Sequence, residues 1–179
     1  FHDETMQRFS KKNEPVNIKV KLVRHQLNEA IPTISEFIQF IHNLNQKIVI
    51  NIEIKSGTET GISTLIKALK KANFKKYVKF IFSSFKPEII RQLIQEQPGQ
   101  IGVLIKNITA FREIKINKKE LKEVDFIIIN YRNIRKKDLV QFIKMKKSIG
   151  IYFQSKTDFE KKRISAIRSY QAKLIFTEG

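Results

Sequence analysis

One stretch of the sequence combines strand-like alternation with residues that handle charge. In residues 50–55 three isoleucines alternate with Asn51, Glu53 and Lys55. If this strand belongs to a parallel barrel, the isoleucines suit the side covered by helices, and the polar set points inward with Glu53 and Lys55 near the catalytic mouth. An inward carboxylate needs a cation or a metal as partner, because burying a bare charge is very costly. An ion pair between Glu53 and Lys55 on an exposed edge strand is the alternative.

Histidine is the other residue type here that could transfer protons near neutral pH. His2 is followed by Asp, a pair that suits acid–base chemistry but is more often a solvated chain end. His25 and His42 show no partner pattern, and we expect them to be structural. Lys86 and Lys106 follow predicted strand ends where a phosphate could bind, but lysine is so abundant in this sequence that the signal is weak.

The elements that must position these residues alternate along the chain. Short runs rich in Ile, Val and Phe predict strands that are buried on both faces. They cover residues 47–55, 78–85, 100–105, 125–130, 149–154 and 173–177. The stretches between them have apolar residues at helical spacing. They predict helices over 61–73, 87–97, about 108–124, 135–147 and 158–170.

Buried strands separated by helices indicate a parallel sheet, either an open doubly wound sheet or a (β/α)8 barrel. The open sheet usually carries a glycine-rich phosphate loop, and this sequence has six glycines and no such motif. Six βα repeats in residues 47–179 fit part of a barrel, whose usual length is about 250 residues. We therefore expect an α/β fold of the TIM-barrel type that lacks about the first two βα units.

The spacing also predicts which helix faces point inward. Helix 61–73 should bury Ile62, Leu65, Ile66 and Leu69, and helix 135–147 should bury Leu139, Phe142 and Ile143.

Residues 1–46 do not show this alternation of buried strands and helices. Alternation over 16–22 predicts a small surface hairpin. In residues 31–41, Thr33 and Glu36 have the spacing of a capping box. Four apolar residues supply the face of the short helix that follows, namely Phe37, Ile38, Phe40 and Ile41.

The chain is strongly basic, but its charge does not decide the function. Lys and Arg number 35 against 17 Asp and Glu, a formal net charge of +18. Such a field attracts polyanions. However, Lys far outnumbers Arg and the basic residues are spread along the chain, which is typical of compositional drift. We do not expect nucleic acid as a partner, and an anionic membrane surface has no further support. Cysteine is absent, which excludes disulfides and thiolate sites.

Four segments, taken together, resemble the glycerophosphodiester phosphodiesterase family. The family pattern runs HD-x-T-L-x-R, I-P-T-L-x-E, a strand N-I-E-I-K, and a strand ending S-S-F. Residues 2–8, 31–36, 51–55 and 83–85 match it in that order. Tyr152 stands in the penultimate strand where a Trp is usual, and Glu178 stands where the last strand has Asp.

The resemblance implies a single domain over 1–179, with a small insertion at 3–31 and six strands of a (β/α)8 barrel over 47–179. It implies hydrolysis of a glycerophosphodiester to an alcohol and glycerol 3-phosphate, with Ca or Mg at the barrel mouth. His2 would match one of two catalytic histidines, and Glu53 a metal carboxylate. Lys55 would lie beside the phosphate, and Tyr152 would line the substrate pocket.

The family's first two strands carry H-R-G and E-x-D motifs, which precede the His-Asp motif at which this sequence starts. We therefore expect an incomplete ligand set and a chain that is inactive alone. A catalytically dead remnant that binds a ligand, and a related barrel phosphodiesterase acting on phospholipids, are the alternatives. The first and last predicted strands would be exposed edges, which favours edge-to-edge self-association. No apolar run reaches membrane-span length, and we expect a cytoplasmic location.

Overall fold

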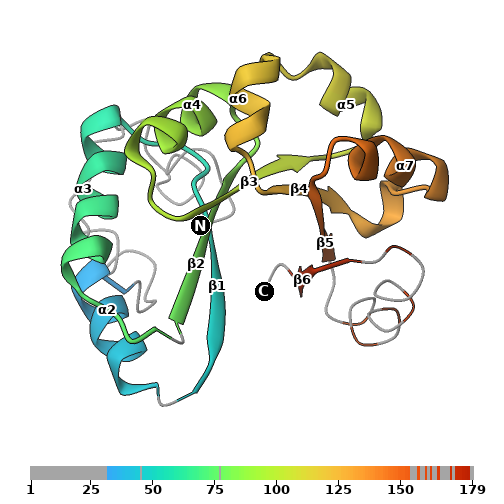
Figure 1. Cartoon of the computed structure of the whole chain (residues 1–179). Helices are drawn as coiled ribbons and strands as arrows, with labels where there is room; N and C mark the ends of the chain where they lie inside the picture. Colours follow the sequence, from blue (N-terminus) through green and yellow to red (C-terminus); the bar gives the residue numbers. More distant parts are fainter. Residues whose placement is uncertain are drawn as a thin grey trace, which may run out of the picture. The chain divides into compact units, whose positions relative to one another are not determined.

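Figure 1 shows the computed structural model, which describes residues 32–44, 46–76, 78–153 and 172–177, and also 157, 160, 162, 165 and 170. The chain falls into two compact units. The first unit is Phe1–Ile48 with Ser56–Val78, and the second unit is Val49–Lys55 with Lys79–Gly179. A single family domain over 1–179 stays a prediction.

The second unit is built on one six-stranded sheet whose strands follow the order of the sequence (Figure 1). The strands are β1 (Ile48–Glu53), β2 (Val78–Ser84), β3 (Gln100–Ile105), β4 (Phe126–Asn130), β5 (Ser148–Phe153) and β6 (Leu174–Thr177). Neighbouring strands from β2 onward pair in parallel, with Val103 opposite Ile127 and Ile129 opposite Ile151. Among the described residues, β1 and β6 are the sheet edges. This α/β arrangement is consistent with part of a TIM barrel, as the sequence predicts.

Alternation along the strands gives the sheet two distinct faces. The inner face, as we name it, carries one buried cluster that comprises Ile81, Leu104, Phe126, Ile128 and Tyr152. The outer face carries Phe82, Val103, Ile127 and Ile151, of which none is more than 1% exposed. Burial on both faces is why the strand sequences are continuously apolar.

Two glycines make room for one large side chain on the inner face. A Cβ built on Gly102 would lie 2.5 Å from Cδ1 of Ile128, and one built on Gly150 would lie 2.9 Å from its Cγ1. Gly102 is in register with Phe126, and Gly150 is opposite Ile128 itself. The inner face is therefore tightly packed around Ile128, as the interior of a barrel is.

The second unit's helices lie close to the predicted positions. They are α4 (Pro87–Glu96), α5 (Ile108–Glu113), α6 (Lys118–Glu123), a 3-10 turn η2 (Tyr131–Asn133) and α7 (Lys136–Lys144). The described residues between 157 and 170 are also helical. The helical region predicted over about 108–124 is divided into α5 and α6, because Asn117 caps a new helix. Ile143 was also wrongly predicted to be buried: it is 53% exposed, whereas Phe142 beside it is fully buried.

The described part of the first unit contains α2 (Ile34–Asn43) and α3 (Glu59–Lys71). The predicted capping box is present, since the Thr33 hydroxyl accepts from the Glu36 N–H and the Glu36 carboxylate accepts from the Thr33 N–H. Of the predicted apolar face of α2, Ile41 is buried, whereas Phe40 is 60% exposed. His42 stacks on Phe74 with ring centroids 4.9 Å apart, which fits a structural role.

Several predictions concern residues outside the described part of the chain. They are the hairpin at 16–22, the insertion at 3–31, and the roles of His2, His25 and Glu178. In the part that is described, no helix is both long and apolar enough to cross a bilayer.

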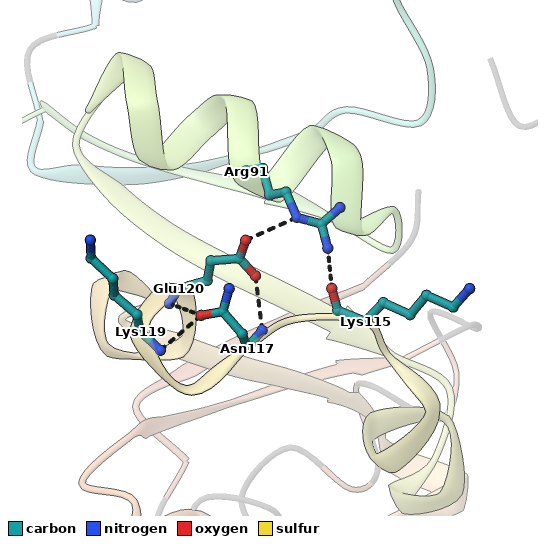
Figure 2. A network of polar contacts seen from close by, with 5 residues as sticks. All are labelled: Arg91, Lys115, Asn117, Lys119 and Glu120. Atoms are coloured by element: carbon teal, nitrogen blue, oxygen red, sulfur yellow. Dashed lines mark hydrogen bonds and ion pairs between the residues drawn. The ribbon is translucent and has the colours of Figure 1, made fainter.

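A polar network joins α4 to the segment that leads into α6 (Figure 2). The Arg91 Nε donates to Oε1 of Glu120 at 2.9 Å, and its Nη2 donates to the backbone oxygen of Lys115. The second oxygen of Glu120 accepts from the Asn117 N–H at 2.8 Å. The Asn117 side chain accepts in turn from the N–H groups of Lys119 and Glu120. Arg91 and Glu120 thereby hold residues 115–117 against α4.

Acid should weaken this network. The pKa of Glu120 lies below its usual range, first because the Asn117 N–H hydrogen-bonds its carboxylate and further because Arg91 is adjacent, while burial opposes both. A carboxyl group with a lowered folded-state pKa stabilises the fold above its unfolded pKa, and this contribution is lost as pH falls through the folded value. We expect the difference in free energy of unfolding between the native protein and Glu120→Gln, called the stability gap below, to shrink below about pH 4.

Urea unfolding at a series of pH values measures this gap. The exposed Glu123 on the same helix provides the control substitution Glu123→Gln. A gap for Glu120→Gln that stays constant from neutral pH to pH 3 would refute the assignment.

Candidate active site

The polar residues of β1 lie on the inner face of the sheet. The hydroxyl of Ser83 donates to Oδ1 of Asn51 at 3.0 Å, and Ser83 is opposite Gly102 on the inner face. Alternation places Glu53 on the same face as Asn51. Glu53 is the last residue of β1, and Lys55 follows two positions later. The predicted inward set is therefore placed at the carboxyl end of a strand, where barrel enzymes keep catalytic residues.

Two serines of β2 fasten this end of β1. The Ile54 N–H donates to the backbone oxygen of Ser83 at 2.8 Å. The hydroxyl of Ser84 donates to the backbone oxygen of Ile54 at 2.7 Å and accepts from the N–H of Lys86 at 3.1 Å. Both serines are fully buried. The chain between Glu53 and Lys55 is thus held by strand pairing and by a buried side chain.

Tyr152 belongs to the core of the inner face. It is 3% exposed and lies opposite Asn130 near the carboxyl end of β5. Its ring meets that of Phe85 edge-on, with centroids 6.2 Å apart and an interplanar angle of 86°. Phe85 follows Ser84, so the S-S-F segment contacts both β1 and β5. The contact of Tyr152 with a substrate stays a prediction.

Sequence reasoning missed the polar residue that ends β4. Asn130 is 2% exposed, and its side chain accepts from the N–H of Arg132 at 2.9 Å. In the turn that follows, Asn133 donates through Nδ2 to the backbone oxygen of Lys106 at 2.8 Å, which ties the ends of β3 and β4 together. The available signal was an Asn that closes the apolar run 126–129.

The described residues do not fit the predicted cation. Ca and Mg bind six or more oxygen ligands; Ca sites usually contain several carboxylates, and Mg sites contain one or two carboxylates with waters and substrate phosphates. No group of three His, Asp or Glu side chains is gathered in the described part of the chain. Of the residues predicted for metal or proton chemistry, only Glu53 lies within that part, and His2 lies outside it. Glu53 alone does not hold Ca or Mg tightly.

Comparisons with known proteins bear on the family and the fold. A family model described as the glycerophosphoryl diester phosphodiesterase family matches residues 1–177. A crystal structure from Galdieria sulphuraria, assigned as a glycerophosphodiester phosphodiesterase, gives a TM-score of 0.67 at 13% identity, covering 97% of this chain and 72% of that one. The N-terminal domain of a Bacteroides vulgatus protein assigned as an aldolase gives 0.49 at 16% identity, covering 82% and 53%. No curated protein sequence matches significantly.

The likeness to the Galdieria sulphuraria structure, at 13% identity, supports the fold alone. The family match spans nearly the whole chain and includes the segments that pack around the end of β1. The chain therefore belongs to the glycerophosphoryl diester phosphodiesterase family, a family of phosphoric diester hydrolases.

Proposed function

We propose that this protein serves the hydrolysis of glycerophosphodiesters to an alcohol and glycerol 3-phosphate with Ca or Mg, and that residues 1–179 alone do not sustain turnover. The observation that carries the proposal is the position of Glu53 and Lys55 at the carboxyl end of β1, fastened by Ser83 and Ser84. The positive charge of Lys55 at that edge suits a reaction that builds negative charge on a phosphate.

Each predicted residue has a role within this proposal. Lys55 offers a positive charge to the phosphate oxygens and stabilises the charge gained in the transition state. His2 exchanges a proton with the substrate or the leaving alcohol. Tyr152, whose ring belongs to the buried cluster of the inner face, lines the substrate pocket. Glu53 offers one carboxylate to a cation, whose chemistry would be to polarise the phosphoryl oxygen.

The expected lack of turnover follows from the same residues. One carboxylate does not hold Ca or Mg tightly, and no group of three His, Asp or Glu side chains is gathered among the described residues. Binding of the phosphate group depends less on that set, because Lys55 supplies charge by itself. We therefore separate binding from turnover in the test.

The test is a steady-state assay of polypeptide 1–179 on glycerophosphocholine with Mg or Ca, which follows glycerol 3-phosphate release. No turnover above the same assay in EDTA is the expected result, and ordinary turnover would contradict it. In parallel, glycerol 3-phosphate binding is measured by calorimetry. Lys55→Ala should weaken it about tenfold, the usual value of a lost hydrogen bond to a charged group.

Lys79→Ala is the matched control, because Lys79 is an exposed lysine near the amino end of β2. Equal losses for Lys55→Ala and Lys79→Ala would mean that general charge attracts the ligand, and the proposed phosphate position would then be wrong. Binding without turnover is also what a catalytically dead family member would show.

A further inference from the structure

A cavity of about 390 Å³ opens where the loops after β2 and β3 meet. Its apolar lining residues are Phe85, Pro87, Leu104, Ile105, Ala110 and Ile114. They come from the residue after β2, the start of α4, the end of β3, and α5 with the residue after it. The volume lies within the range of small-molecule sites. The cavity therefore sits among the strand-to-helix loops at the carboxyl edge, the functional edge of barrel enzymes.

The charged residues around this cavity are Lys106, Glu113 and Lys115. Two of the three are cationic, and Lys106 directly follows β3 as Lys55 follows the end of β1. An apolar lining with two lysines complements a ligand that joins an apolar chain to an anionic group. A small polar alcohol would leave most of that lining without a partner.

The wall of the cavity is held in place by the network in Figure 2. Arg91 donates to the backbone oxygen of Lys115 and to Glu120, which in turn accepts from Asn117. Phe85, which also lines the cavity, packs against the inner-face cluster and meets Tyr152 edge-on. Two of the lining residues, Lys115 and Phe85, are thus held by contacts with other parts of the fold, which lowers the cost of ordering a ligand there.

We infer that this cavity holds an aliphatic chain of the substrate, so that the substrate class is a glycerophosphodiester bearing an apolar chain. The inference rests on the proposed function for the phosphate. The chain can belong to either ester partner: the leaving alcohol, or an acyl group on the glycerol. Both sources share the chemistry of an apolar chain next to a phosphodiester.

The test compares three ligands of polypeptide 1–179, each below its micelle concentration. They are glycerophosphocholine, the octyl ester of glycerol 3-phosphate, and 1-octanoyl-glycerophosphocholine. Calorimetry should show at least one octyl ligand binding about tenfold or more tightly than glycerophosphocholine, since several methylenes leave water. The identity of the tighter ligand shows which ester partner carries the chain. No gain for either octyl ligand, including no binding at all, would overturn the inference.

Two substitutions test whether the tighter binding of an octyl ligand depends on this cavity. Ala110→Phe fills it and should abolish the gain, and Ile114→Ser removes an apolar wall without adding bulk and should reduce the gain about threefold or more. Ala68→Phe is the control, because Ala68 is a half-buried helical alanine that does not line the cavity. An unchanged gain in both cavity variants would refute the site.

The two proposals fail separately. An octyl gain that is lost in Ala110→Phe, together with glycerol 3-phosphate binding that Lys55→Ala leaves unchanged, would support the cavity and refute the proposed phosphate position. Sensitivity of glycerol 3-phosphate binding to Lys55→Ala without any octyl gain would do the reverse.

Discussion

Replacing Phe142 with Ala should lower the free energy of unfolding by about 3–5 kcal/mol. Phe142 is fully buried in α7, and its ring meets that of Phe111 edge-on with centroids 5.1 Å apart at 89°. Truncation loses the transfer free energy of the ring, leaves a cavity, and removes the contact between α7 and α5. Domains of this size are stable by about 5–15 kcal/mol, so the loss is a large fraction of the total.

Urea denaturation followed by circular dichroism measures this loss. The control is the neighbouring substitution Ile143→Ala, which should cost no more than about 0.5 kcal/mol because that side chain is 53% exposed. If Phe142→Ala does not fold, Phe142→Leu provides a milder variant that should still destabilise by more than Ile143→Ala does. Equal stabilities of the variants at the two positions would show that Phe142 is not a core residue in solution.

Ile143 also shows that the sequence alone does not predict which apolar residues of a helix are buried. The spacing of apolar residues in α7 predicted both Phe142 and Ile143 as inward, but adjacent helical residues point about 100° apart and only one of them meets the neighbouring elements. The same limit explains Phe40 in α2, which is 60% exposed. Periodicity predicts that a helix has an apolar face, but the neighbouring elements decide how wide the buried arc is.

The strands were predictable because burial on both faces demands continuous Ile, Val and Phe. All six predicted runs contain the observed strands to within a residue or two at their ends. The division between α5 and α6 was locally encoded as well, since Asn117 and Glu120 form a capping box of the same spacing as Thr33 and Glu36. That signal was present in the sequence and was missed.

The site was predictable only in part. Alternation alone placed Asn51 and Glu53 on one face. The anchoring of β1 by Ser84 and the cavity between the β2 and β3 loops depend on contacts between residues about 20 to 30 positions apart. No local spacing encodes such contacts, so they become visible only in the folded chain.

Replacing Ser84 with Ala should disturb both stability and ligand binding. The Ser84 hydroxyl donates to the backbone oxygen of Ile54 at 2.7 Å and accepts from the Lys86 N–H. Ile54 is 6% exposed, so its carbonyl would lose a buried donor. An unsatisfied buried group costs about 1–3 kcal/mol, and we expect the free energy of unfolding to fall by that amount.

The binding consequence distinguishes an anchor of the site from an ordinary core residue. Ile54 lies between Glu53 and Lys55, so freeing its carbonyl should loosen Lys55 and weaken glycerol 3-phosphate binding, measured by calorimetry on the folded variant. Ser56→Ala, in an exposed position just after Lys55, is the control and should change neither quantity. If Ser84→Ala is destabilised but binds glycerol 3-phosphate as tightly as the native chain, the hydroxyl supports the sheet alone and does not position Lys55.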